Sequence, residues 1–222
     1  MYKKLGILGG MGPLATYTLY KDIIFNTPAA VDQDHIDMVI LNASYIPDRT
    51  AGILHNGKSP LPYLLEAVKT LERCGCDLIA IPCNTSHYYY YELQDKCNVR
   101  ILHMPDLTAE AAAKNGVNKV YLLATEGTIK TGVYQKCFES RGIDIITPID
   151  EEIAEMMRVI YDIKAGNAPA LDTLESMAKQ YEHEAIAVLG CTEFSTVKFE
   201  NLRHIDAMQV LRDKILELFG VQ

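Results

Sequence analysis

The sequence predicts an α/β protein of two pseudo-symmetric lobes, each a four-stranded parallel sheet flanked by helices, with a functional site between them. Short apolar runs typical of strands alternate with longer helical patterns along the 222 residues, which is the pattern of βαβ units. The order of these elements is then repeated: residues 4–10 align on residues 119–125, a shift of 115 positions (119 − 4). Both observations indicate two similar doubly wound lobes in one chain.

The first half should contain four strands and three helices. The strands are the short apolar runs at residues 5–9, 38–42, 78–82 and 100–103. Helices are expected at residues 13–26, 60–74 and 86–96. Pro13 and Pro60 suit the first turn of a helix, and Gly75 suits the position after its last residue.

The second half repeats this order after a linking helix at residues 105–115, which Gly116 closes. Its strands are expected at residues 120–124, 143–147, 186–189 and 202–205. The last helix, residues 206–219, follows a fourth strand just as the linking helix does, so we expect it to return to the first lobe. The predicted flavodoxin-like lobes are residues 1–104 and 105–205, with helix 206–222 packed on the first.

The composition is that of an ordinary globular protein, with 49% hydrophobic and 23% charged residues. No apolar run approaches the roughly 18 residues of a membrane span, so we expect a cytoplasmic protein. A net charge of −8 without a basic stripe disfavours binding to nucleic acid or to a membrane. The six cysteines show no C-x-x-C spacing, so we expect free thiols and no metal site.

The first strand ends in a glycine-rich turn, Gly9-Gly10-Met11-Gly12-Pro13. In doubly wound lobes, ligands bind beyond the carboxyl ends of the strands, where the strand order reverses. Glycines there permit a tight turn, and the N-terminus of the following helix can receive an anion. The turn lacks the G-x-G-x-x-G and G-K-[ST] patterns, which disfavours a nucleotide ligand.

Two cysteines end the third strands of the two halves, in Pro82-Cys83-Asn84-Thr85 and Gly190-Cys191-Thr192-Glu193. Each precedes a predicted helix, whose N-terminus lowers the pKa of a thiol. One such cysteine is most simply a small buried residue, but two at equivalent places indicate a shared role. Facing lobes with one thiol each suit a reaction that removes a proton from one face of a carbon and returns one to the other.

Together these segments resemble the aspartate/glutamate racemases that act without pyridoxal phosphate. The resemblance covers nearly the whole chain and is carried by residues 8–16, 47–50, 82–85, 123–128, 160–164 and 190–193. It implies a homodimer with no cofactor, in which Cys83 and Cys191 are the acid/base pair that interconverts L- and D-aspartate. Glutamate and a broader acidic range stay open. Gly9-Gly10 and Glu193 replace the Asp-Ser pair and the histidine usual in cell-wall glutamate racemases, which favours the aspartate branch.

The resemblance also assigns binding residues for a small dicarboxylic amino acid. Asn84, Thr85 and Thr192 would hold the α-carboxylate or orient the thiols. Arg49 and Lys164 would hold the side-chain carboxylate. An independent argument supports these two cations, because an acidic protein that binds a dicarboxylate must offset its own field locally, and an arginine fork matches carboxylate geometry.

Four further residues in the matching segments have open roles. Met11, Thr125 and Thr128 lie in the two first-strand turns, where they can contact the ligand or cap a helix. Glu193 can polarise Cys191, assist the substrate ammonium group or begin a helix. His87 lies four residues after Cys83, but without a second pair of ligands we interpret it as a packed residue.

Other functions are compatible with the same fold. Hydantoin racemases, maleate isomerases and arylmalonate decarboxylases resemble this superfamily, and the pair Arg49 and Lys164 favours an acidic amino acid over their substrates. A non-catalytic amino-acid-binding protein is a second alternative. The presence of both Cys83 and Cys191 disfavours it.

Overall fold

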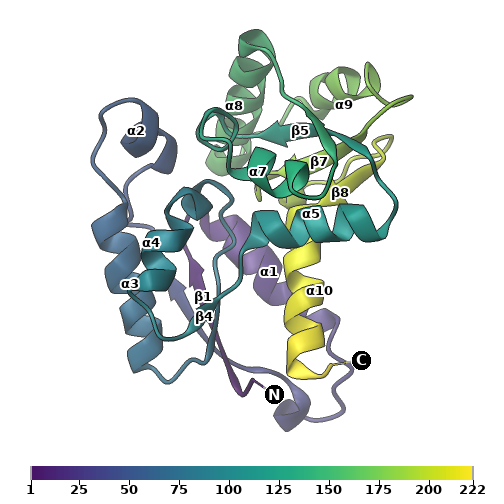
Figure 1. Ribbon diagram of the computed structural model, residues 1–222. Helices are drawn as coiled ribbons and strands as arrows, with labels where there is room; N and C mark the ends of the chain where they lie inside the picture. Colours follow the sequence, from purple (N-terminus) through teal and green to yellow (C-terminus); the bar gives the residue numbers. More distant parts are fainter. Residues whose placement is uncertain (1, 222) are drawn as a thin grey trace.

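The computed structural model describes residues 2–221, and these residues form two four-stranded parallel sheets flanked by helices, which confirms the predicted α/β architecture (Figure 1). In spatial order the first sheet consists of β2 (Asp37–Asn42), β1 (Lys4–Gly9), β3 (Leu78–Ala80) and β4 (Arg100–Ile101). The second consists of β6 (Asp144–Ile146), β5 (Lys119–Ala124), β7 (Ile186–Gly190) and β8 (His204–Asp206). The identical order places the reversal beside β1 and β5, at equivalent places.

The register of the central strands positions the loops that follow them. In the second sheet β5 pairs with β7 from Val120 opposite Ile186 to Ala124 opposite Gly190. These strands are apolar and buried along most of their length, as is typical of parallel sheets that are covered on both faces. Because Gly190 immediately precedes Cys191, the turn after β5 and the cysteine turn lie side by side.

The first lobe contains α1 (Pro13–Phe25), α2 (Arg49–Leu54), α3 (Leu61–Arg73) and α4 (Tyr90–Asp95). The predicted starts of α1 and α3 are correct to within one residue. Helix α2 lies in a segment where no helix was predicted, and Asp48 caps it by accepting a hydrogen bond from the Ala51 amide at 2.8 Å.

The prediction of one helix at residues 86–96 is wrong in its first part. Residues Thr85–Tyr89 form a 3-10 helix, and the α-helix begins only at Tyr90. The buried His87 ring explains the tight turn. Its Nδ1 donates to the Cys83 carbonyl at 3.0 Å and its Nε2 accepts from the Met104 amide at 3.2 Å, so the ring ties this turn to the segment after β4.

The remaining helices are α5 (Met104–Lys114), α6 (Glu126–Lys130), α7 (Val133–Glu139), α8 (Asp150–Ala165), α9 (Leu171–Lys179) and α10 (Ala207–Phe219). Three acidic residues in the first turn of α8 stabilise its dipole, and Gly166 ends it in the left-handed conformation. Helix α8 carries Lys164 in its last turn.

Two helices connect the lobes. Helix α5 leaves β4 and packs on α7 of the second lobe, whereas α10 follows β8 and packs on both α1 and α5 (Figure 1). One hydrophobic core therefore runs from Leu19 of α1 through Leu211 of α10 to Val188 of β7. The boundary between residues 104 and 105 stays a prediction.

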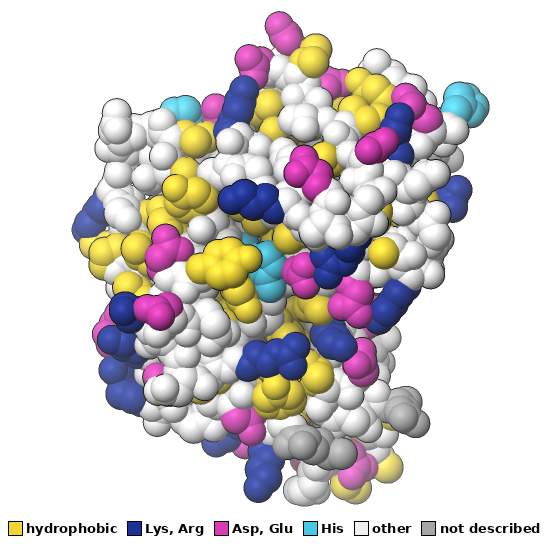
Figure 2. Space-filling model, in the orientation of Figure 1, with side chains coloured by type: hydrophobic (Ala, Val, Ile, Leu, Met, Phe, Trp, Pro, Cys, Tyr) yellow, Lys and Arg dark blue, Asp and Glu magenta, His cyan; other side chains and the backbone are white. Residues whose placement is uncertain are grey.

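Figure 2 shows acidic and basic side chains intermixed over one face of the molecule. Within residues 2–221, no helix combines the length and the apolar character needed to cross a bilayer.

Candidate active site

One pocket lies between the carboxyl ends of the two sheets, with an empty volume of about 370 Å³ including its open mouth. Cys83 contributes to it from the first lobe and Cys191 from the second. The other predicted site residues that line it are Met11, Arg49, Asn84, Thr85, Thr125, Lys164, Thr192 and Glu193. Thr128, for which ligand contact and helix capping were both open, is fully buried and lies behind Thr85 and Thr125. The fold thus brings both thiols to one cavity.

The thiol of Cys191 is next to a buried carboxylate. Its Sγ donates a hydrogen bond to Oε2 of Glu193 at 3.0 Å. Burial, followed by the negative charge of Glu193, raises the pKa of Cys191 well above its ordinary value. The residues after Cys191 form only a short 3-10 helix, Phe194–Thr196. The expectation that a helix N-terminus lowers the pKa of this thiol is therefore wrong.

Arg49 is a buried cation at the start of α2, only 8% exposed. Its Nη2 donates to the Met11 carbonyl at 3.1 Å and its Nη1 to the Pro47 carbonyl at 3.2 Å. Burial opposes its charge, but Cys83 and Asp48 outweigh this effect and raise the pKa of Arg49. Within the described residues its Nε has no hydrogen-bond partner. A buried guanidinium with a free donor is suited to an anionic ligand.

Lys164 supplies a second cation from α8. Its Nζ lies 3.6 Å from Oε1 of Glu193 and 5.6 Å from the centre of the Tyr161 ring. Burial alone would lower the pKa of Lys164, but the negative charges of Glu193 and Cys191 raise it. Lys164 therefore stays charged beside Glu193, whose Oε1 accepts no hydrogen bond from any residue in the range 2–221.

Three hydroxyl groups connect the lobes beside the pocket. Oγ1 of Thr85 lies 2.8 Å from Oγ1 of Thr125 and 3.0 Å from Oγ1 of Thr128. Thr125 also caps α6 by accepting from the Thr128 amide at 3.1 Å. Because Thr85 belongs to the first lobe and the other two to the second, these bonds fix the spacing of the two walls.

Asn84 is oriented by a residue that we did not predict. The buried Tyr134 hydroxyl, on α7, donates to Oδ1 of Asn84 at 2.6 Å. Oδ1 is therefore occupied, whereas Nδ2 has no partner among the described residues. Since Asn84 lines the pocket, its amide can donate to a bound carboxylate.

Further pocket residues were also missed. Asp48 and Tyr161 line the pocket and lie within the segments that carried the resemblance, so their place in those segments was an available signal. Tyr134 is fifty positions from Asn84, and nothing in the sequence connects the two.

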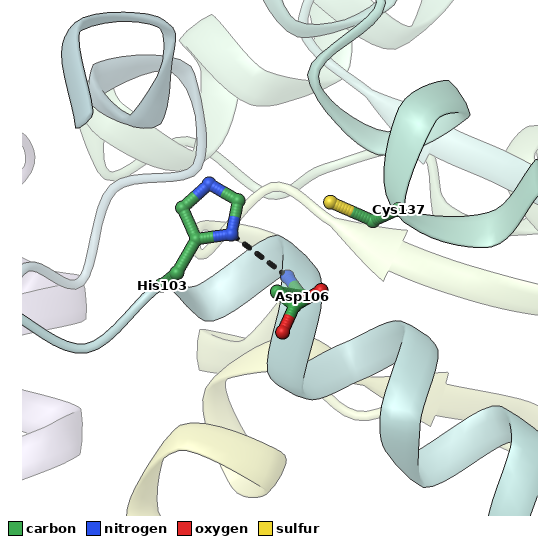
Figure 3. Close-up of side chains that lie close together, drawn as sticks. All are labelled: His103, Asp106 and Cys137. Carbon is green, nitrogen blue, oxygen red and sulfur yellow. Dashed lines mark hydrogen bonds between the residues drawn. The ribbon is translucent and has the colours of Figure 1, made fainter. Parts of the chain in front are cut away.

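A separate cluster of potential metal ligands lies outside the pocket. The donor atoms of His103, Asp106 and Cys137 lie within 4.8 Å of one another, and Figure 3 shows the Cys137 sulfur facing the His103 ring. Nδ1 of His103 accepts the Asp106 amide at 3.3 Å, and the Asp106 carboxylate pairs with Arg141 at 2.8 Å. Two of the three donors thus already have protein partners, which cap α5 and join it to the turn after α7.

Comparison with known proteins identifies the family of this fold and site. A family model described as Asp/Glu/Hydantoin racemase matches residues 8–213. The chain belongs to this family. The aspartate racemase of Picrophilus torridus is 31% identical, with a TM-score of 0.89 over 99% of this chain and 95% of that one. An aspartate racemase homologue from Pyrococcus horikoshii is 30% identical, with a TM-score of 0.77 over 98% and 99% of the two chains.

Relatives named for other substrates also match this chain. The broad specificity amino-acid racemase RacX of Bacillus subtilis is 29% identical over 204 residues, which cover 87% of this chain and 86% of RacX. The glutamate racemase of Aquifex pyrophilus is 26% identical over 155 residues, or 67% and 59% of the two chains. The chain is thus a racemase-family protein whose relatives are named for different amino acids.

Proposed function

We propose that this protein racemises an acidic amino acid, aspartate in the first place, by a two-base reaction of Cys83 and Cys191 that needs no pyridoxal phosphate. The observation that carries the proposal is the position of the two thiols. They follow equivalent central strands of opposite lobes, β3 and β7, and line one pocket that also holds the buried Arg49 and the partly exposed Lys164. The names of the two aspartate racemase relatives favour aspartate.

In this reaction one cysteine acts as a thiolate and takes the α-proton from one face of the substrate. The other cysteine, as a thiol, delivers its proton to the opposite face, so the configuration inverts. The enzyme thus receives one proton from the substrate and gives one proton to the product. Positioned proton transfer of this kind contributes about 10²–10⁴-fold for each group. The reverse reaction exchanges the two roles.

The polar groups of the pocket support a dicarboxylate substrate. We assign the side-chain carboxylate to Arg49 and Lys164, and the α-carboxylate to the free amide donor of Asn84. Donors beside the α-carboxylate stabilise the charge that develops there when the α-proton leaves. The hydroxyls of Thr85 and Thr192 are bonded to protein, so we assign them to orientation of the pocket walls. Met11 supplies its carbonyl to Arg49.

The test is incubation of the pure protein, free of pyridoxal phosphate, with L-aspartate and separately with L-glutamate in D₂O. Optical inversion and α-deuterium are followed together. Inversion with deuterium entering mainly the product enantiomer is expected for two bases. Neither inversion nor exchange with either acid would contradict the proposal and favour a related isomerase or a binding protein.

Single substitutions test the two thiols. Cys83→Ser and Cys191→Ser should each abolish racemisation in both directions, because each thiol is needed once per turnover. Cys97→Ser is the matched control, since Cys97 is also buried but does not line the pocket. Activity near that of the wild type in either pocket variant would exclude the two-base reaction.

A further inference from the structure

The two thiols have opposite electrostatic neighbours. Cys83 and the Arg49 guanidinium belong to the first lobe and line the same pocket. Burial lowers the pKa of Arg49, and the nearby Cys83 is the largest of the influences that raise it. Cys191 instead donates a hydrogen bond to the Glu193 carboxylate at 3.0 Å. The lobes are pseudo-symmetric in their strands, but the charges beside their cysteines differ in sign.

We propose that Arg49 and Glu193 fix one resting form of the active, singly ionised protein, in which Cys191 keeps its proton and the thiolate is at Cys83. The proposal rests on the two-base function above for the roles of the two sulfurs. A guanidinium stabilises a thiolate, whereas a carboxylate stabilises the protonated form of a neighbouring thiol, both by its charge and by accepting the S–H bond. Glu193 is thus a positioning residue that holds the proton on Cys191.

Charged and titratable groups on the surrounding elements agree with this assignment. Cys191 faces Glu193 on its own segment, Lys164 on α8 and Tyr134 on α7. Lys164 favours a thiolate at both cysteines, but its Nζ is 3.6 Å from Oε1 of Glu193, which offsets its charge near Cys191. Cys83 faces Arg49 and Lys164, and His87, which is held neutral by burial, contacts its carbonyl.

The resting state favours one direction of turnover. The enantiomer whose α-hydrogen faces Cys83 meets the thiolate at once, and its product leaves the protein with Cys83 protonated and Cys191 ionised. One proton must then pass from Cys83 to Cys191, by exchange with water, before the cycle repeats. The opposite enantiomer requires the rarer form of the free protein. The two enantiomers have equal free energy in water, so kcat/KM must be the same for both. The preference for one direction can therefore appear only as a difference in KM that is accompanied by a difference in kcat of the same factor.

The experiment measures the alkylation rate of each cysteine by iodoacetamide between pH 6 and 10, with peptide mass spectrometry to separate the sites. Only thiolates react, so the midpoint of each rate profile reports protonation. Cys83 and Cys191 are buried to the same extent, with 5% and 4% of each residue exposed, so burial does not favour alkylation of either one. The midpoint of Cys83 should lie below that of Cys191. Glu193→Gln should move the Cys191 midpoint down by about one pH unit or more, since a neighbouring like charge is removed.

Glu126→Gln is the matched control, because it removes the same charge from the adjoining groove, where Glu126 pairs with His55. It should leave both midpoints in place. Equal midpoints in the wild type, no alkylation of Cys83 at any pH, or a Cys191 midpoint that stays or rises in Glu193→Gln would each overturn the proposal. A rise would make Glu193 a base for Cys191 instead.

Steady-state kinetics provide a second test of the resting state. The ratio of KM for the two enantiomers should differ from one in the wild type and move toward one in Glu193→Gln. Alkylation does not depend on turnover, so the expected midpoints without racemisation would contradict only the proposed function. Racemisation with equal midpoints would contradict only the resting state.

Discussion

The hydroxyl of Thr192 donates a hydrogen bond to the carbonyl of Pro82 at 3.2 Å. Thr192 directly follows Cys191 and Pro82 directly precedes Cys83, so one bond joins the backbones of the two cysteine turns across the lobes. The distance between the thiols is therefore set by a direct contact as well as by the packing of the sheets.

Thr192→Val should remove this link while keeping the size of the side chain. We expect a loss of about 1 kcal/mol in the free energy of unfolding, because the buried Pro82 carbonyl loses its partner. We also expect kcat to fall by about 10-fold or more, since small misplacements of reacting groups are costly. Chemical unfolding and racemase assays measure the two effects. Thr192→Ser keeps the hydroxyl and is the control; equal kcat in both variants would contradict the link.

Arg49→Leu should weaken aspartate binding by about 2–5 kcal/mol, the usual effect of removing one partner of a buried charge pair. Isothermal titration with L-aspartate gives the affinity. Arg141→Leu is the matched control, because Arg141 pairs with Asp106 away from the pocket. Unchanged affinity in Arg49→Leu would exclude Arg49 as a carboxylate ligand.

Gly127→Ala should separate the lobes beside the threonine hydroxyls. A Cβ at this position would lie 2.7 Å from Oγ1 of Thr50 and 2.8 Å from Cγ2 of Thr85. We expect about 1–3 kcal/mol of overpacking together with a loss of activity. Gly142→Ala is the control that separates loss of stability from loss of activity. A Cβ at position 142 meets nothing within 4 Å, but the φ of +69° still strains an alanine. That variant should lose stability, measured by thermal unfolding, and keep its activity.

The His103 imidazole makes stability depend on pH. Burial, followed by the neighbouring His87, lowers the pKa of His103 to about 4, whereas the unfolded chain protonates it near 6.5. Between these values the unfolded state binds the proton and the folded state does not, so stability falls as the pH drops. The full difference is about 3 kcal/mol.

His103→Asn keeps an acceptor for the Asp106 amide and does not titrate in this range. Its free energy of unfolding should therefore decline less between pH 7 and pH 4.5 than that of the wild type, with denaturant titrations at each pH as the measurement. The buried His87 is present in both proteins, so the difference between the two curves reports the removal of His103. Parallel curves would show that His103 is not the titrating group.

The strands, and the helices that begin or end at a proline or glycine, could be predicted from sequence because these signals are local. Apolar runs mark β1 and β5, and a proline or glycine marks the ends of α1 and α3. The six-residue α2 was missed, since it holds Gly52 and is too short for a helical pattern. The pocket position of Cys83 and Cys191 followed from the repeat together with the rule that ligands bind beyond the carboxyl ends of such strands.

The electrostatics of the site could not be predicted in the same way. The pKa of Cys191 depends on burial and on the direction in which the Glu193 side chain turns, and tertiary packing decides both. The orientation of Asn84 depends on Tyr134, a residue of the other lobe. Local sequence patterns carry no information on such contacts.

The last helix of each half packs on the other lobe: α5 follows β4 and packs on α7, and α10 follows β8 and packs on α1. This exchange of helices has a consequence for how such a pocket can arise by gene duplication. Two copies of a half-length chain could build the same arrangement by trading their last helices about a two-fold axis, each copy contributing one thiol. In that ancestral pair the two sulfurs would have identical surroundings. Fusion of the copies into one chain removes this constraint, because each half can then acquire its own substitutions. A carboxylate beside one thiol and a guanidinium beside the other is an asymmetry that only the fused chain can encode.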